Sequence, residues 1–266
     1  MAAEPAARIP YGRCPLCEAP GGTEVLVADC SAHELYRKPL PPTQRWLRCE
    51  KCGHLFVDGY FSPAALKVLF SSTPQGQLPG RDIEGQRFSW ASVLDTVGTL
   101  QPPAGRWLDV GFGSGALLTT AAEFGYEVAG IDLREENVRL MRDAGYDVRA
   151  AGLDDYHAAP FDVVSMADVL EHMPFPKRAL RRAWQLLQPA GLLFLSMPNA
   201  DSFVWQAATR NRSNPYWGEL EHYHNFGRKR LYALLEECGF EVARYGVSFR
   251  FRMCMELIAR KRARAA

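Results

Sequence analysis

The sequence predicts an α/β protein, with a doubly wound and mostly parallel sheet that follows a small cysteine-rich module. Strand and helix patterns alternate from residue 88 onward, which is typical of this class. A glycine-rich turn joins the first strand of that series to a helix, and four of the seven cysteines fall in the first fifth of the 266 residues. We therefore expect a module with its linker over residues 1–80 and a second domain over 81–266.

The elements of the second domain follow from apolar spacing. Apolar residues recur every three or four positions in the expected helices, whereas the expected strands are short apolar runs. The helices are expected at 88–100, 116–124, 134–144, 176–187 and 228–238, and the strands at 106–110, 127–131, 161–165, 191–197, 240–245 and 255–259. In the first domain, 25–27 and 46–47 are short enough to be strands of a ribbon.

Composition excludes several classes of protein. An apolar content of 47% excludes disorder, and 31 basic against 30 acidic residues give no general attraction to nucleic acid or anionic membranes. No run of 18 apolar residues and no early secretion signal occurs, so we expect a cytoplasmic protein that does not engage a membrane. One local exception is the basic cluster near the C-terminus, which we interpret as a solvated tail: Arg260, Lys261, Arg262 and Arg264.

The cysteine pairs predict a metal site. Cys14-Pro-Leu-Cys17 and Cys49-Glu-Lys-Cys52 each form a tight turn, and together they offer four thiolates. Tetrahedral Zn²⁺ requires such a set at about 2.3 Å per bond, and four protein ligands leave no position for substrate. We therefore expect structural zinc in a zinc-ribbon module. Four unrelated buried cysteines or a redox pair are the alternatives, and the redox pair is disfavoured because neither pair follows a thioredoxin-like strand.

The glycine-rich turn predicts an adenosine ligand. It runs Asp109-Val-Gly111-Phe-Gly113-Ser-Gly115 between the first strand and the next helix, and Asp132 ends the second strand about 20 residues later. Glycines let a ligand approach the backbone, and a carboxylate at Asp132 can accept both ribose hydroxyls. The spacing G-x-G-x-G differs from that of the dinucleotide fingerprint. Asp109 would also repel a pyrophosphate but suits a cationic amino acid end.

These residues resemble motif I of class I S-adenosylmethionine-dependent methyltransferases, and the resemblance extends over residues 105–259. It implies a Rossmann-like sheet of seven strands and S-adenosylmethionine as the cofactor. It also implies that Asp109 faces the methionine moiety, that Asp132 and Leu133 hold the ribose and adenine, and that Asp154 approaches the adenine amine. The implied cofactor-binding residues are Asp109, Gly111, Phe112, Gly113, Gly115, Asp132, Leu133, Asp154, Asp168 and Val169.

Methyl transfer needs an oriented nucleophile and a group that removes its proton. His172, in Glu171-His172 after the fourth strand, is one candidate; a helix-capping or packed histidine is the alternative. The loop 198–227 holds the others, Glu221, His222 and His224, among aromatic residues that can exclude water. An ordinary polar loop is the alternative there.

The four-cysteine module, the Glu-His after strand four and Glu221-His222-x-x-x-Phe226 together resemble bacterial methyltransferases of sugar and polysaccharide pathways. That resemblance implies acid–base roles for His172, Glu221 and His222, and a small-molecule or carbohydrate acceptor. The families that this resemblance covers include sugar C-methyltransferases. Glu219 stands where those enzymes usually have an aromatic residue, and the chain ends without the additional C-terminal domain that they carry. O-methylation is therefore favoured over C-methylation. Ribosomal RNA as the acceptor is disfavoured by the near-neutral charge, and a non-catalytic binding protein is disfavoured by the intact glycine turn.

Overall fold

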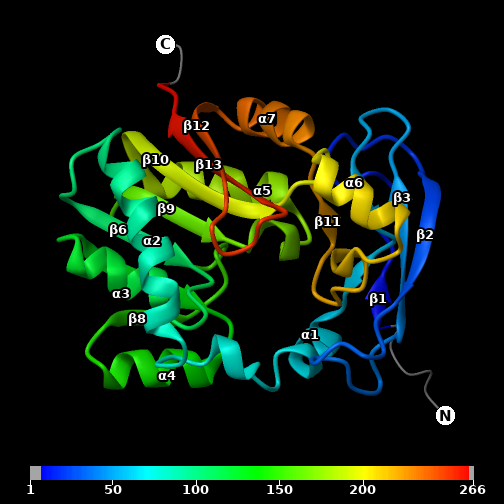
Figure 1. The fold of residues 1–266 in the computed structure, drawn as a ribbon, viewed down its shortest axis with the longest axis horizontal. Coiled ribbons are helices and arrows are strands. Elements are labelled where there is room, and N and C mark those ends of the chain that lie inside the picture. Colours follow the sequence, from blue (N-terminus) through cyan, green and yellow to red (C-terminus); the bar gives the residue numbers. More distant parts are fainter. Residues whose placement is uncertain (1–6, 264–266) are drawn as a thin grey trace. The chain divides into compact units, whose positions relative to one another are not determined.

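The computed structural model describes residues 7–263, and the chain forms two compact units (Figure 1). Unit 1 contains the chain up to Ser72, Glu171–Pro176 and Pro198–Leu231, and unit 2 contains Thr73–Leu170, Lys177–Met197 and the chain from Tyr232 onward. This division differs from the expected single boundary at residue 80, because the long loop after the fifth strand of the series folds with the N-terminal module. Each unit is therefore discontinuous in sequence.

Unit 2 is built on a sheet of seven strands in the order β12-β13-β10-β9-β6-β7-β8. The five strands from β10 to β8 pair in parallel, and β12 pairs with β13 antiparallel. The strands are β6 (Arg106–Val110), β7 (Glu127–Asp132), β8 (Asp147–Ala150), β9 (Phe161–Ala167), β10 (Leu187–Pro198), β12 (Phe240–Val247) and β13 (Cys254–Lys261). The predicted α/β class and the seven-stranded sheet are confirmed.

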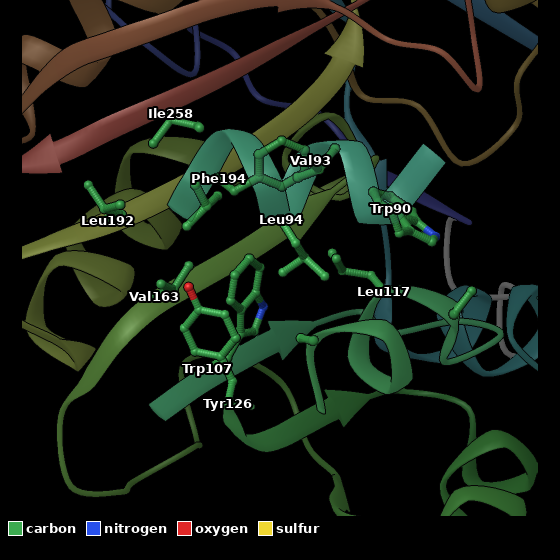
Figure 2. Close-up of a cluster of buried hydrophobic side chains, with 13 residues drawn as sticks. Trp90, Val93, Leu94, Trp107, Leu117, Tyr126, Val163, Leu192, Phe194 and Ile258 are labelled. Carbon is green, nitrogen blue, oxygen red and sulfur yellow. The ribbon is translucent and has the colours of Figure 1, made fainter. Parts of the chain in front are cut away.

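Amphipathic helices cover this sheet. In α2 (Ile83–Gly98) the buried residues Trp90, Val93, Leu94 and Val97 follow the i, i+3, i+4, i+7 spacing of one helix face. They pack with Trp107, Phe194 and other strand residues in one core cluster, shown in Figure 2. The remaining helices are α3 (Ala116–Glu123), α4 (Glu135–Asp143), α5 (Pro176–Leu186) and α7 (Arg228–Glu237).

The central strands are buried on both faces. Every residue of β6 after Arg106 is buried. In β9 only Asp162 and Ala167 are partly exposed. Successive side chains of a strand point to opposite faces, so such continuous burial requires cover on both sides. Polar side chains therefore gather where strands end, and the carboxyl ends are where open α/β sheets bind ligands.

Unit 1 holds two small antiparallel sheets. One has the order β11-β4-β3-β2, and the other pairs β1 with β5. His224 and Asn225 of β11 pair with Phe56 and Leu55 of β4, which is how the loop after β10 joins the N-terminal module. The elements are β1 (Arg8–Ile9), β2 (Thr23–Asp29), β3 (Thr43–Arg48), β4 (Leu55–Val57), β5 (Tyr60–Phe61), α1 (Pro63–Leu69), α6 (Phe203–Arg210), β11 (His224–Asn225) and the short helical turns η2 (Leu170–His172) and η3 (Pro215–Trp217). The two ribbon strands predicted at 25–27 and 46–47 lie within β2 and β3.

The basic cluster near the C-terminus is part of the fold. Arg260 and Lys261 belong to β13, and they donate hydrogen bonds to the carbonyl oxygens of Ala190 (3.1 Å) and Leu187 (2.6 Å). The expectation of a solvated tail is therefore wrong for these two residues, because the strand continues through them. Arg264 lies outside the described residues.

No helix between residues 7 and 263 has both the length and the apolar character that crossing a membrane requires. All seven cysteines are free thiols.

Candidate active site

The glycine turn adopts backbone conformations that favour glycine. Gly111, Gly113 and Gly115 have φ angles of +66°, +52° and +77°. A Cβ at Gly111 would lie 2.8 Å from Cγ2 of Val169, so Val169 packs against the turn. At Gly113 a Cβ would meet nothing closer than 3.9 Å, so a ligand can approach its Cα closely.

Asp132 fixes this turn. The buried carboxylate accepts hydrogen bonds from the backbone N–H groups of Gly113 (3.0 Å) and Arg134 (2.8 Å), one on each oxygen. Burial raises the pKa of Asp132, although these backbone bonds act in the opposite direction. Each carboxylate oxygen can accept a second hydrogen bond, so the capacity to bind a ribose remains.

Asp109 lies at the end of β6 and is buried. Its Oδ1 accepts a hydrogen bond of 2.6 Å from the hydroxyl of Ser165, which in turn accepts one of 2.8 Å from the indole of Trp107. Burial raises the pKa of Asp109 to about 7, and the bond from Ser165 lowers it in part. A carboxylate in this state is readily stabilised by a cationic ligand.

Other expected cofactor residues differ in their surroundings. Leu133 is 54% exposed although it is a large apolar residue, and it offers a surface to a planar ring beside Asp132. Phe112 belongs to the glycine turn, but its side chain is buried in a core cluster with residues of α3 and α4, which leaves its backbone for contact with a ligand. Asp154 is exposed and pairs with Arg178 at 2.6 Å.

Asp168 stands in a hydrogen-bonded chain that the sequence did not indicate. Its φ is +55°, and its two oxygens accept hydrogen bonds from Ser196 Oγ (2.9 Å) and from the guanidinium of Arg250 (2.7 Å). Arg250 also lies 3.8 Å above the ring of Trp90. Asp168 directly follows β9, as expected. Its carboxylate already binds two side chains of unit 2, Ser196 and Arg250.

Asn137 is a second residue that sequence reasoning missed. It is fully buried, and its side-chain amide donates to the carbonyl oxygens of Gly113 and Gln77, both at 2.9 Å. Thr73 donates to its oxygen at 3.2 Å. Asn137 therefore holds the glycine turn against the segment before α2. The sequence signal that could have identified Asn137 is a polar residue at a position of the helix 134–144 where apolar residues are expected.

The four predicted zinc ligands come together in unit 1. Their sulfur atoms all lie within 4.8 Å of one another. Two of the separations are 3.7 Å (Cys14–Cys52) and 3.5 Å (Cys17–Cys49), close to the edge of about 3.8 Å that a tetrahedron with bonds of about 2.3 Å would have. Each pair is followed by a residue with positive φ, Glu18 or Gly53, which closes the turn.

A second cluster in unit 1 joins Glu171, His172 and His222. One ligand atom of each lies within 4.8 Å of the other two. The imidazole rings of His172 and His222 meet edge to face at 4.7 Å. Glu171 and His222 are buried, at 1% and 5% exposure, and burial followed by the proximity of His172 lowers the pKa of His222 well below its usual value.

Two of the four expected catalytic residues have other surroundings. The carboxylate grouped with the two imidazoles belongs to Glu171 and not to the expected Glu221, which is half-buried. His224 is buried between His54 (3.0 Å) and the carbonyl oxygen of Met173 (3.0 Å), so both of its ring nitrogens are engaged. The expected catalytic role of His224 would require one of these two contacts to be released.

Aromatic side chains surround the cluster within unit 1. Tyr216 stacks on His222 with ring centroids 6.0 Å apart, and Trp205 stacks on Tyr216 at 5.6 Å. The loop is further fixed by a hydrogen bond of 2.9 Å between Glu219 and His33. The expectation of an aromatic and polar loop at 198–227 therefore corresponds to an ordered part of unit 1.

The fold and these residues agree with a comparison to protein families. Residues 83–245 match the sequence profile of a family described as a methyltransferase domain. That range contains the glycine turn, the strand-end carboxylates of Asp109, Asp132 and Asp168, and the cluster of Glu171, His172 and His222.

Curated relatives include enzymes named ubiquinone biosynthesis O-methyltransferase. The protein from Xanthomonas axonopodis pv. citri (strain 306) is 38% identical over 109 residues, which cover 38% of this chain and 46% of that protein. The one from Bordetella avium (strain 197N) is 33% identical over 130 residues, or 46% of this chain and 52% of that protein. The chain thus spans about half the length of the curated relatives it matches.

Solved structures show the same fold at low identity. The 1,6-didemethyltoxoflavin-N1-methyltransferase of Burkholderia thailandensis, solved with S-adenosylhomocysteine, has a TM-score of 0.58 and 19% identity, over 81% of this chain and 99% of that one. The magnesium protoporphyrin IX methyltransferase of Synechocystis PCC 6803 has a TM-score of 0.55 and 19% identity, over 77% and 90%.

We predict that Gly111→Ala destabilises unit 2 by about 1–3 kcal/mol, because the new Cβ requires a strained φ and meets Val169. The double variant Gly111→Ala/Val169→Ala should recover the steric part alone. Gly125→Ala is the control, since its φ is +94° and a Cβ there would meet nothing within 4 Å. Urea denaturation followed by circular dichroism measures the difference. Equal losses for Gly111→Ala and Gly125→Ala would contradict the contact with Val169.

Proposed function

The chain belongs to the methyltransferase-domain family, and on that premise we propose that it transfers the methyl group of S-adenosylmethionine to a hydroxyl oxygen of a sugar or related small metabolite. A carbon acceptor is the alternative within the same chemistry. The observation that carries the proposal is the pair of buried carboxylates, Asp109 and Asp132, at the ends of adjacent strands on either side of the glycine turn. The O-methyltransferase names of the curated relatives support an oxygen acceptor.

In the proposed complex, unit 2 binds the cofactor through its strand ends. Asp132 accepts the ribose hydroxyls on its remaining lone pairs, and the exposed side chain of Leu133 lies against the adenine. Asp109 faces the cationic methionine end, where its burial makes the interaction strong. A ligand can approach the Cα of Gly113, where a Cβ would meet nothing closer than 3.9 Å. Val169, which packs against the turn at Gly111, is also proposed to contact the cofactor. Asp154 and Asp168 complete the set proposed for the cofactor, each through a carboxylate already paired with an arginine.

The reaction is an in-line displacement at the methyl carbon. The acceptor oxygen forms a bond to that carbon, the carbon–sulfur bond breaks, and its electron pair stays with sulfur to give S-adenosylhomocysteine. The hydroxyl must lose its proton to become a good nucleophile, and a positioned base contributes about 10²- to 10⁴-fold to such a step. We assign that step to His172 and His222, with Glu171 as their carboxylate partner in place of Glu221. His172 follows Val169 by three positions in the chain.

We also propose that Cys14, Cys17, Cys49 and Cys52 hold one structural Zn²⁺. The sulfur separations and the two closed turns support this assignment. A module of this size has too small a core to be stable alone, and a bound metal supplies the missing folding energy. None of the seven cysteines forms a disulfide, which supports the proposed cytoplasmic location.

We predict that the affinity for S-adenosylmethionine rises about tenfold between pH 6 and pH 8. Asp109 is protonated below a pKa of about 7, and only its ionised form attracts the cationic methionine end, so binding weakens as the pH falls. Calorimetry across this range provides the measurement. Asp109→Asn should bind weakly at every pH, and a pH dependence that persists in this variant would rule out Asp109 as its source.

We predict methyl transfer to hydroxylated small molecules, measured as S-adenosylhomocysteine formed and as a product heavier by one CH₂. The acceptor panel contains nucleotide sugars, glycans, phenols and RNA. Asp132→Ala should lose activity through binding, and Glu171→Gln and His222→Ala should each lose about 10²-fold in kcat. Glu221→Gln is the matched control for Glu171→Gln. A larger loss in Glu221→Gln would restore the pair expected from the sequence, and methylation of RNA alone would refute the proposed acceptor class.

We predict one zinc per chain by atomic emission spectroscopy of protein purified without chelator. Cys49→Ser should lose the metal and expose unit 1 to proteolysis, because three ligands bind Zn²⁺ far more weakly than four. Cys30→Ser is the control, since Cys30 is also buried but lies outside the cluster. Zinc retained at full stoichiometry in Cys49→Ser would disprove the site.

A further inference from the structure

We propose that a hollow in unit 2, between α2 and the hairpin of β12 and β13, binds one uncharged sugar ring. The hollow has a volume of about 150 Å³ and is lined by residues of α2, β10, β12 and β13. A cavity of about this size holds one six-membered ring such as benzene. The lining residues that the structure describes lie outside the proposed cofactor site and outside the cluster of Glu171, His172 and His222.

The register of the hairpin explains why a hollow forms there. Arg244 of β12 pairs with Ile258 of β13. Gly246 pairs with Glu256, two positions further on, so these four positions share one face of the sheet. On this face β12 has no side chain at Gly246, where a Cβ would meet nothing closer than the Cβ of Glu256 at 4.0 Å. A glycine inside a strand often marks the close approach of a ligand, and here it leaves room for a ring.

The floor of the hollow is apolar and belongs to the core of unit 2. Val93 of α2, Phe194 of β10 and Ile258 of β13 line it, and all three are part of the buried cluster in Figure 2. Ile258 packs in the same cluster as the buried face of α2. The hollow therefore lies on the face of the sheet that α2 covers, and it offers the apolar contact that a ring needs.

Phe249 lines the same hollow and lies in an ordered turn. Its side chain is 67% exposed. The hydroxyl oxygen of Ser248 accepts hydrogen bonds from the N–H groups of Arg250 (3.2 Å) and Phe251 (3.4 Å). The N–H of Ser248 donates to the carbonyl oxygen of Cys254 at 3.0 Å. A ligand that stacks on Phe249 therefore meets a preorganised turn. One face of a sugar ring bears mainly C–H groups, which pack well on an aromatic ring.

The charged groups of the hollow select an uncharged ring with several hydroxyls. Glu256 and Arg244 both line it and lie on the same face of the hairpin. A carboxylate accepts hydrogen bonds and a guanidinium donates them, whereas a sugar hydroxyl can do both. An anionic ligand would be repelled by Glu256 and a cationic ligand by Arg244. A phenol has only one hydroxyl for the two partners, so neighbouring hydroxyls on one ring match them better.

The hairpin is also linked to the strand ends of unit 2. Arg250, next to Phe249 in the chain, donates to Asp168 at 2.7 Å, and Val169 beside Asp168 packs against the glycine turn. A ring in the hollow would therefore be held by the same hairpin that contacts the proposed cofactor site. That this ring is part of the methyl acceptor rests on the proposed function, whereas binding of the ring does not.

The test is saturation-transfer difference NMR of the full chain without cofactor. The probes are the neutral methyl pyranosides of glucose, galactose and mannose, compared with phenol and methyl glucuronide. We expect at least one neutral glycoside to bind with a Kd of about 1 mM, as suits a ligand of this size. Phenol and the glucuronide should bind about tenfold more weakly. Phe249→Ala and Glu256→Gln should each raise the Kd of the glycoside about tenfold.

Phe88→Ala and Glu241→Gln are the matched controls and should bind as the wild type does. Phe88 lies in α2 and Glu241 in β12, and both are exposed and outside the described lining of the hollow. Phe249 is exposed and glutamine is isosteric with glutamate. Circular dichroism of both test variants separates a lost site from a lost fold.

Each outcome decides the proposal. Absence of binding of all three neutral glycosides at about 50 mM overturns it. Binding that Phe249→Ala and Glu256→Gln leave unchanged would place the sugar elsewhere and overturn it as well. Tighter binding of phenol or of the glucuronide would refute the uncharged sugar as the ligand. A chain that binds a glycoside as expected but methylates no acceptor refutes the proposed function alone, and a chain that methylates an acceptor but binds no glycoside refutes the hollow alone.

Discussion

Burial of the central strands of unit 2 on both faces is the constraint on which the rest of that unit depends. A polar group inside such a sheet is stable only if it is hydrogen-bonded. Two serines lie in this interior, and each donates to an aspartate at a strand end: Ser165 to Asp109, and Ser196 to Asp168. The interior polar atoms are thereby satisfied, and the aspartates are oriented by the strands. The same bonds that stabilise the sheet also define the carboxylates available to a ligand.

The two aspartates differ in what remains for a ligand. Asp168 is paired with the guanidinium of Arg250, so its charge is compensated within unit 2. Asp109 has no such direct ion pair among the described contacts, and burial raises its pKa to about 7. A cation near Asp109 therefore gains a charge interaction that a cation near Asp168 would gain only by displacing the arginine. This difference favours Asp109 as the partner of a cationic cofactor.

Much of unit 2 could be predicted from sequence because its pattern is local. The apolar spacing of Trp90, Val93 and Val97 identifies a helix, and the run from Arg106 to Val110 identifies a strand. Strand β8 was missed because only Val148 among its four residues is buried, so it shows no clear alternation. Arg250 and Asn137 were missed for another reason. Their partners are 82 residues away in the case of Asp168 and 60 in the case of Gln77, and no short motif records such pairs.

Unit 1 was harder to predict because its parts are separated in sequence. The spacing of the four cysteines predicts a common site, and the structure groups them as expected. The segment 198–231 joins unit 1 through β11, a strand of two residues too short to give a periodic signal, and through hydrogen bonds from Gln44 and Trp46 to the carbonyl oxygen of Trp217. The expected Glu221–His222 pair was adjacent in sequence, whereas the observed partner, Glu171, comes from a distant segment. Glu221 lies in a turn, in which the N–H of His222 donates to the carbonyl oxygen of Glu219, and the fold groups His222 with Glu171.

His224 and His54 form a buried, hydrogen-bonded pair in unit 1. A carbonyl oxygen can only accept, so His224 donates through Nε2 to Met173 and its Nδ1 accepts a hydrogen bond from Nε2 of His54. His224 is therefore neutral in this arrangement, and burial lowers the pKa of His54 well below its usual value. His54 also accepts, through its backbone carbonyl, from the N–H of Cys49. One continuous set of contacts thus runs from the second cysteine turn, through His54 and His224, to the carbonyl oxygen of Met173, next to His172 in the chain.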